Sequence, residues 1–400
     1  MTGSTASDDE AWILSTVEGN ALLAEVAAVS SPQPADFARW RLRAPSERVS
    51  AALRLAESRR RGRAKFARAG QMWFDRTGLE QSTSEPVARH KAKRFAAPGR
   101  LVVDLCSGIG GDTLALASVA KVIAVDADLA MCRRTLWNAS AYNLRDQVLA
   151  VQGRAEAISI PAGAWVHIDP DRRLQKPTRA KNIDEYVPNL AFLQALPRLA
   201  EAGAVKLGPA SDFEDHFDGP DHEIELVSLA GECKEATAWF GATRSCRRRA
   251  TCLPRFATWT DLDGPAYAFA PAGPVLPWVF DPDPALRRSG LMDAFAAVHG
   301  LTRFVNGADF LTGPDLLDSP FLTPFEVLAS LPMDLKRIKR ELQARAVGTL
   351  EIKTRGVTLR PEDLRVALRV KGPESATLLL AAGHDEARAV IARRHPLKPR

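Results

Sequence analysis

Three aspartates stand at the carboxyl ends of predicted apolar strands, and a glycine-rich loop follows the first of them. Asp104 ends LVVD and leads into the loop at 105–112, Asp126 ends KVIAVD, and Asp169 ends AWVHID. Glycine lets the backbone approach a ligand closely, and a helix that starts beyond the loop offers free N–H groups. A carboxylate at the tip of the second strand is placed to hold a ribose diol. Because the carboxyl ends of parallel strands meet at one edge of a sheet, the pattern predicts a nucleoside-binding site there.

The elements that must position these residues alternate between strand and helix. This alternation predicts a parallel sheet with right-handed crossovers. Two further strands, 222–229 and 232–240, are joined by a tight turn at Ala230-Gly231. A terminal hairpin does not belong to the six-stranded dinucleotide fold, so we expect an α/β sheet whose last strand runs antiparallel. The expected strands lie near 101–105, 121–126, 147–152, 164–169 and 203–207, and the expected helices lie near 112–119, 128–142 and 186–200.

The segments on both sides of this sheet predict further domains. The run 11–29 has the spacing of one helix, and a second helix is expected to start at a Ser46 N-cap. Ser84 is expected to cap a helix over 85–95. From 324 the pattern is helix, strand, helix, strand, strand, which is typical of a small α+β domain. We therefore expect four parts, namely an N-terminal helical domain (1–82), the sheet domain (83–245), a connecting region (246–323) and the α+β domain (324–400).

Charge is unevenly distributed along the chain, which carries a net +6. Residues 1–38 hold six acidic residues and no lysine or arginine, whereas residues 39–68 hold eleven basic residues against two glutamates. Residues 331–371 hold eleven basic residues against five acids. Such asymmetry favours a polyanionic partner, although a solvated helix face is the alternative for each cluster. A further cluster consists of Arg244, Arg247, Arg248, Arg249 and Arg255.

Composition argues against several other classes of protein. The five cysteines are scattered and form no Cys-x-x-Cys pair, which predicts neither a disulfide framework nor a metal site. No apolar run approaches the roughly 18 residues of a membrane span. The polar, acidic N-terminus lacks the basic region of a secretory signal. We therefore expect a cytoplasmic protein without a metal or a membrane partner, and the sequence carries no indication of its oligomeric state.

Taken together, residues 84–240 resemble a class I S-adenosylmethionine-dependent methyltransferase. The resemblance rests on DLCSGIGGD at 104–112, on Asp126, on Asp169-Pro170 and on the closing hairpin. The glycine loop, together with STSEP at 82–86, resembles the trimethylguanosine-synthase type of RNA methyltransferase in particular. Residues 324–392, with GTLEIKTRGV, resemble the THUMP-like domain that accompanies a set of bacterial RNA methyltransferases. The resemblance implies a Rossmann-like, seven-stranded sheet and S-adenosylmethionine as cofactor.

The resemblance also assigns roles to individual residues. Asp169 would accept a hydrogen bond from an exocyclic amine of a base in structured RNA, tRNA or rRNA, and Pro170 would fix the backbone beside it. The related enzymes carry Asn or Asp, then Pro-Pro and an aromatic residue, whereas this chain has Asp-Pro-Asp-Arg-Arg. The implied cofactor-binding residues are Thr83, Asp104, Cys106, Gly108, Gly110, Gly111, Asp112, Asp126 and Glu156, and the implied substrate-binding residues are Asp171, Arg172, Arg173, Arg247, Arg248 and Arg249.

Two other functions are compatible with parts of this pattern. The missing second proline and aromatic residue favour a non-catalytic RNA-binding adaptor that keeps the methyltransferase fold. A nicotinamide-dependent oxidoreductase would share the glycine loop, but the glycine spacing and the closing hairpin argue against it.

Overall fold

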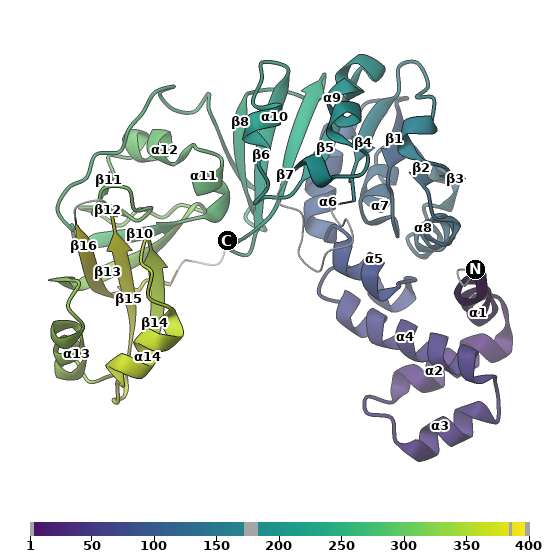
Figure 1. The fold of residues 1–400 in the computed structure, drawn as a ribbon, viewed down its shortest axis with the longest axis horizontal. Coiled ribbons are helices and arrows are strands. Elements are labelled where there is room, and N and C mark those ends of the chain that lie inside the picture. The colour runs from purple at the N-terminus through teal and green to yellow at the C-terminus, as the bar shows by residue number, and fades with distance from the viewer. Residues whose placement is uncertain (1–3, 172–182, 384–385, 397–400) are drawn as a thin grey trace. The chain divides into compact units, whose positions relative to one another are not determined.

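The computed structural model describes residues 4–171, 183–383 and 386–396 (Figure 1). Contacts divide it into two compact units. The first unit consists of Met1–Leu207, Ser211–Phe213 and Trp239–Thr243, and the second of Gly208–Ala210, Glu214–Ala238 and Arg244–Arg400. Within the described residues, no helix is long and apolar enough to cross a membrane.

Helices form the N-terminal part of the first unit. The single helix predicted over 11–29 is wrong, because the structure has two helices with a break at Thr16. Thr16 has extended backbone angles, and its hydroxyl accepts a hydrogen bond from the N–H of Gly19 at 3.0 Å. A threonine side chain that caps a new helix competes with continuation of the old one. The helices are α1 (Ser4–Ser15), α2 (Val17–Ala28), α3 (Pro34–Arg41), α4 (Ser46–Gly62), α5 (Arg76–Gln81) and α6 (Glu85–Ala92), with short 3-10 turns η1 (Ala69–Gln71) and η2 (Lys93–Phe95).

We predicted that two helices start at Ser46 and at Ser84, and the structure differs from both predictions in detail. Pro45, not Ser46, occupies the N-cap position of α4. Ser84 is the N-cap residue of α6, as predicted, but its side chain makes no capping hydrogen bond.

The strands that carry the predicted site run parallel in the first unit. Their order is β3-β2-β1-β4-β5, and β1 pairs in parallel with both β2 and β4. Every residue of β4 and β5 is buried, as expected of parallel strands covered on both faces. The predicted strand–helix alternation is confirmed. The elements are β1 (Leu101–Leu105), α7 (Gly111–Ala117), β2 (Lys121–Asp126), α8 (Leu129–Ala141), η3 (Arg145–Gln147), β3 (Val148–Gln152), η4 (Ala155–Ala157), β4 (Trp165–Ile168), η5 (Ile183–Glu185), α9 (Leu190–Leu199) and β5 (Ala202–Leu207).

The hairpin predicted after these strands is present. Positive φ angles of 53° at Ala230 and 80° at Gly231 form the tight turn between its strands. The sheet order continues β5-β7-β6 and is extended by β8 and β9, so the sheet has nine strands rather than the expected seven. The elements are α10 (Glu214–Phe217), β6 (His222–Leu229), β7 (Glu232–Gly241), β8 (Arg248–Leu253) and β9 (Ala257–Thr260).

A separate seven-stranded sheet lies in the second unit, in the order β11-β12-β10-β13-β16-β15-β14. Its strand β13 was predicted as the start of a helix, which is wrong. β13 pairs with β10 and β16 on its two sides, and this pairing outweighs local propensity. The elements are β10 (Trp278–Pro282), α11 (Pro284–Arg288), α12 (Met292–Val298), β11 (Thr302–Arg303), β12 (Leu311–Gly313), β13 (Leu322–Pro332), α13 (Leu335–Ala344), β14 (Val347–Arg355), α14 (Pro361–Leu368), β15 (Glu374–Ala382) and β16 (Ala387–Arg394).

Residues 246–323, expected as a connecting region, contribute to both sheets. They contain β8 and β9 of the nine-stranded sheet and β10 to β12 of the seven-stranded sheet. The domain boundaries at 82, 245 and 323 stay predictions.

Asn138 on α8 ties three segments of the first unit together. Its Oδ1 accepts from the N–H of Trp73 at 2.6 Å, and its Nδ2 donates to the carbonyls of Trp73 at 3.1 Å and Ile109 at 2.8 Å. The side chain is fully buried. One amide therefore fixes the segment before α5 and the glycine loop against α8.

We predict that Asn138→Ala lowers the free energy of unfolding by about 2–4 kcal/mol, because it leaves buried peptide groups without partners. Chemical denaturation monitored by circular dichroism measures the change. Ser140→Ala, at an exposed position on the same helix, is the control and should stay within about 0.5 kcal/mol of the wild type. Equal stabilities for the two variants would contradict this role of Asn138.

Candidate functional site

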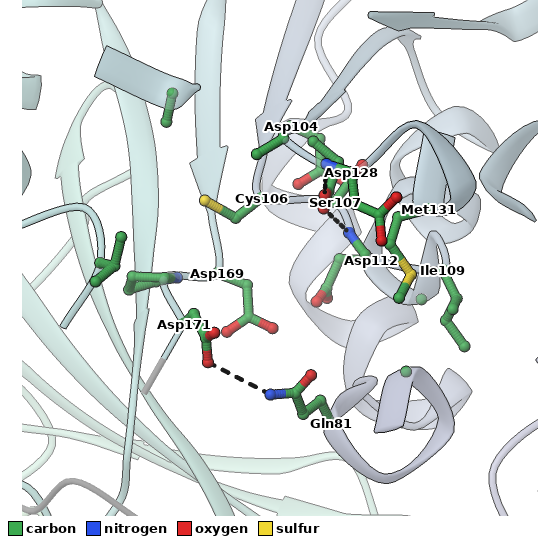
Figure 2. Close-up of a pocket in the computed structure, with 18 of the residues that line it drawn as sticks. Gln81, Asp104, Cys106, Ser107, Ile109, Asp112, Asp128, Met131, Asp169 and Asp171 are labelled. Atoms are coloured by element: carbon green, nitrogen blue, oxygen red, sulfur yellow. Dashed lines mark hydrogen bonds between the residues drawn. The ribbon is translucent and has the colours of Figure 1, made fainter. Parts of the chain in front are cut away.

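A cavity of about 470 Å³ opens at the edge formed by the carboxyl ends of β1, β2 and β4 (Figure 2). Its volume falls within the roughly 300–1,000 Å³ of small-molecule sites. Segments outside the sheet complete its wall, among them α5 and the residues that follow it. The lining residues are Thr77, Gly78, Gln81, Ser82, Thr83, Asp104, Cys106, Ser107, Gly108, Ile109, Gly111, Asp112, Asp126, Ala127, Asp128, Met131, Gly153, Arg154, Ala155, Glu156, Asp169, Pro170, Asp171, Val187 and Pro188.

The loop after β1 has a conformation that its glycines permit. Gly108 and Gly110 have φ angles of 55° and 87°, which most residues avoid. At Gly111, a Cβ atom would lie 3.2 Å from the carbonyl oxygen of Thr83. The glycines therefore allow the loop to turn and allow the 82–83 segment to approach the start of α7.

Asp126, at the tip of β2, holds this loop and faces the cavity. Its Oδ2 accepts from the N–H of Gly108 at 2.8 Å, and its Oδ1 accepts from the N–H of Asp128 at 2.9 Å. Burial raises the pKa of Asp126, and the two N–H groups oppose that rise. Each carboxylate oxygen keeps a further lone pair that can accept from a ligand hydroxyl.

Asp104, by contrast, is engaged within the protein. It is almost fully buried, with Oδ2 accepting from the Thr113 hydroxyl at 2.5 Å and Oδ1 lying 2.7 Å from His167 Nδ1. His167 Nε2 lies 3.2 Å from the ammonium nitrogen of Lys91. With Lys91 donating to Nε2, the ring carries its proton on Nδ1 and donates it to Asp104. This chain of contacts fixes β1, β4 and α6 beneath the cavity.

Two buried lysines, Lys91 and Lys206, hold the carboxylates of Asp112 and Asp169, which line the cavity. Lys91 lies 3.0 Å from Asp112 Oδ1, and the Thr83 hydroxyl donates to Asp112 Oδ2 at 2.6 Å. Burial opposes ionisation of Asp112, but the charges of Lys91 and Lys206 and the hydrogen bond from Thr83 hold the pKa of its carboxyl well below the ordinary value. Lys206 Nζ donates to Thr83 Oγ1 at 2.7 Å and to Asp169 Oδ2 at 2.5 Å.

Asp169, Pro170 and Asp171 form the wall opposite Met131 and Ile109 (Figure 2). The backbone of Asp171 exchanges two hydrogen bonds with Val187, at 2.8 and 3.0 Å, which fixes this wall. Gln81 Nε2 donates to Asp171 Oδ1 at 3.4 Å. Carboxylates therefore dominate this side of the cavity.

Cys106 also lines the cavity, in the left-handed backbone region at φ 60°. Burial, and then the carboxylates of Asp126, Asp169, Asp104 and Glu156, raise the pKa of its thiol well above the ordinary value. A thiol kept protonated is a poor nucleophile, so Cys106 contributes shape to the site rather than covalent chemistry.

The chain resembles known proteins in sequence. The sequence matches the RNA cap guanine-N2 methyltransferase family over residues 99–186 and the THUMP domain-like family over residues 322–394. It is 34% identical, over 321 residues, to an uncharacterized S-adenosylmethionine-dependent methyltransferase of Mycobacterium tuberculosis, in strain CDC 1551 / Oshkosh and in strain H37Rv alike. The match covers 78% of this chain and 84% of the relative. The chain belongs to the S-adenosylmethionine-dependent methyltransferases.

A solved structure shares the fold over nearly its whole length. This crystal structure, of a protein from Porphyromonas gingivalis W83 provisionally assigned as a methyltransferase, has a TM-score of 0.72 and 19% sequence identity. The alignment covers 98% of both chains. The fold that the two proteins share therefore includes the regions on both sides of the nine-stranded sheet as well as the sheet itself.

The residues of this methyltransferase fit S-adenosylmethionine in size and charge. The cavity wall carries seven carboxylates, and Arg154 is the one basic residue among the described residues that line it. A sulfonium and an α-ammonium group are both cationic, so an acidic wall attracts the cofactor. Asp126 and Glu156, on η4 after β3, both line the cavity, and their predicted contacts with the ribose and the adenine stay predictions.

The structure brings together most of the residues predicted from the sequence, and each role stays a prediction. Eight of the nine predicted cofactor residues line the cavity; Gly110 does not, and it serves as the N-cap residue of α7. Arg172 and Arg173 lie outside the described residues. Arg247, Arg248 and Arg249 belong to the second unit and are engaged by carboxylates, with Arg249 Nε 2.8 Å from the buried Glu223 and Arg248 Nη2 2.7 Å from Asp218.

Several residues of the site were not predicted. Gln81 ends the short helix α5, Ser82 lies in the STSEP segment but was not assigned a role, and Met131 belongs to the apolar pattern of α8. The sequence could have indicated a buried ion pair at Lys206, because a lysine within an apolar run such as AGAVKL is buried only when a group of opposite charge pairs with it.

We predict that Asp126→Ala weakens S-adenosylmethionine binding by about 1.5–3 kcal/mol, or roughly 10- to 100-fold, because charge-assisted hydrogen bonds to the ribose are lost. Isothermal titration calorimetry measures the affinity. Asp146→Ala, at an exposed position on η3, is the matched control and should bind as the wild type does. Unchanged affinity in Asp126→Ala would remove this residue from the cofactor site.

Proposed function

We propose that the methyltransferase transfers a methyl group to an exocyclic amine of a base in RNA. The observation that carries this proposal is the acceptor wall Asp169-Pro170-Asp171, with two carboxylates at the tip of β4 on the cofactor cavity. Carboxylates accept hydrogen bonds and donate none, so they recognise a group that carries N–H donors. An exocyclic amine has two N–H donors and a lone pair that can attack a methyl group.

The acidity of the cavity favours a base over a phosphate as the entering group. Seven carboxylates repel a phosphate oxygen, whereas a base that leaves its stack enters as a neutral ring. The phosphates of the nucleic acid would then contact basic surfaces outside the cavity.

The residues of the chain act mainly by positioning. When bound, S-adenosylmethionine supplies an electrophilic methyl group on a sulfonium. Asp169 accepts one N–H of the amine, which directs the lone pair toward that methyl group, and Pro170 restrains the backbone between the carboxylates. Alignment of two reactants supplies several kcal/mol, up to roughly 7–11 in favourable cases. After transfer, the amine nitrogen carries an extra proton, which it loses to Asp169 or to water.

Family and charge support RNA as the acceptor. The matched families are an RNA cap guanine-N2 methyltransferase family and a THUMP domain-like family, the type of domain that accompanies RNA methyltransferases. On α4, Arg54, Arg60 and Arg61 are exposed, whereas Arg59 is partly buried, donates to the carbonyl of Met72 and has its pKa lowered to about 10 by burial. Structured RNA, tRNA or rRNA, is the proposed substrate. Asp171, Arg172, Arg173 and the cluster Arg247–Arg249 are proposed to contact it.

We predict that the wild-type protein transfers a tritiated methyl group from S-adenosylmethionine into unmodified tRNA or rRNA transcripts, and that Asp169→Ala loses most of this activity while binding the cofactor normally. Nucleoside mass spectrometry of the product identifies an N-methylated base. Asp146→Ala is the control, with activity close to wild type. Near-normal turnover by Asp169→Ala would exclude the residue from catalysis, and transfer into no RNA would redirect the search to a protein or small-molecule acceptor.

We predict that exposed basic residues of α13 bind RNA phosphates. Removing residues 324–400 would delete most of β13 and leave β10 without that partner strand, so substitution on the surface is the cleaner test. Lys336→Ala with Arg340→Ala should weaken RNA binding and reduce the log–log slope of affinity against salt by about 0.7–0.9 for each lost contact. Fluorescence anisotropy measures this slope. Gln343→Ala on the same helix is the control, and an unchanged slope in the double variant would exclude α13 from the RNA surface.

A further inference from the structure

Lys206 is a charged residue in the fully buried strand β5. Its side chain is only 4% exposed, and every residue of the strand is buried. An ammonium group in such a place is stable only with close partners of opposite charge. Two carboxylates supply that charge, with Asp169 Oδ2 at 2.5 Å and Asp112 Oδ2 at 4.0 Å, and the Thr83 hydroxyl accepts a further hydrogen bond at 2.7 Å.

These partners place Lys206 behind the wall of the cavity that faces the acceptor. Lys206 does not line the cavity, whereas Asp169 does, with 23% of its side chain exposed. The ammonium group takes Oδ2 of Asp169, so Oδ1 is the oxygen that can accept from a group inside the cavity. A carboxylate held at one oxygen has little freedom to rotate the other.

The hydroxyl of Thr83 fixes the lysine in turn. It accepts from Lys206 and donates to Asp112, whose other oxygen is held by Lys91. Lys206 therefore cannot swing away from Asp169 without breaking a second buried hydrogen bond. A lysine needed only for stability would not have to end on a carboxylate that reaches the cavity.

We propose that Lys206 is a positioning residue for the acceptor site: it holds Oδ2 of Asp169 and thereby directs Oδ1 toward the amine that receives the methyl group. This proposal rests on the proposed function, in which Asp169 binds the acceptor amine. Lys206 itself contacts neither acceptor nor cofactor.

The test needs no identified RNA, because sinefungin carries an amine at the position of the methyl group that S-adenosylmethionine transfers. S-adenosylhomocysteine has a sulfur that bears no group at that position, so the ratio of the two affinities, compared between Asp169→Asn and the wild type, measures the contact between the amine and Asp169. The wild type should bind sinefungin at least about tenfold more tightly than S-adenosylhomocysteine, as one charge-assisted hydrogen bond provides. Removal of the Lys206 ammonium by itself makes the wall more negative and would raise the preference for a cationic amine. Lys206→Met should instead lose most of this preference, because Asp169 is no longer held toward the amine, while binding S-adenosylhomocysteine within about twofold of the wild type.

Two further variants complete the design. Lys206→Gln, which is neutral but polar, should also lose the preference, and it serves if the methionine variant does not fold. Lys121→Met, at an exposed position where β2 begins, is the matched control and should keep the preference. Melting temperatures and S-adenosylhomocysteine binding establish that each variant is folded.

The outcomes separate this proposal from the one on which it rests. If Asp169→Asn loses the preference and a folded Lys206 variant keeps it in full, the positioning role of Lys206 is overturned while the role of Asp169 stands. If Asp169→Asn keeps the preference, the proposed role of Asp169 fails, and the inference about Lys206 fails with it.

Discussion

Buried ionic contacts beneath the carboxyl edge of the parallel sheet are the constraint on which the site depends. Lys91 and Lys206 are buried, and each would be strongly destabilising without its carboxylate. Their partners come from separate elements, since Asp112 lies on α7, Asp169 follows β4 and Thr83 precedes α6. Correct pairing therefore requires these elements to pack in their observed positions, and this packing places the carboxylates around the cavity.

The same arrangement separates two tasks that need opposite charges. Inside the cavity, carboxylates attract a cationic cofactor and, in the proposed function, accept N–H donors from a base. Outside it, α4 in one unit and α13 in the other carry exposed basic residues, which we propose bind phosphates. Arg248 and Arg249 are less available for this, because Glu214, Asp218 and Glu223 engage them.

Sequence reasoning located the cofactor edge because its signals are local. Asp104, the glycine loop and Asp126 each follow an apolar strand within a few residues, and periodicity alone places such residues at one edge. The role expected for Asp104 needs the structure for its details, since its carboxylate lines the cavity but already accepts a hydrogen bond from Thr113 and contacts His167.

What escaped prediction depends on contacts between distant segments. Strand β13 has helix-compatible residues, and only its pairing with β10 and β16 decides its state. The break between α1 and α2 depends on one side chain, the hydroxyl of Thr16 that caps α2. The contact of Lys206 with Thr83 joins residues 123 positions apart, and no spacing rule reveals it.

The most direct measurement is a crystal structure of the protein with S-adenosylhomocysteine bound. The account predicts ribose hydroxyls within about 2.5–3.0 Å of the Asp126 carboxylate, and Asp169 still held by Lys206 with Oδ1 turned toward the homocysteine sulfur. A ribose bound away from Asp126, or a sulfur that faces away from Asp169, would contradict it.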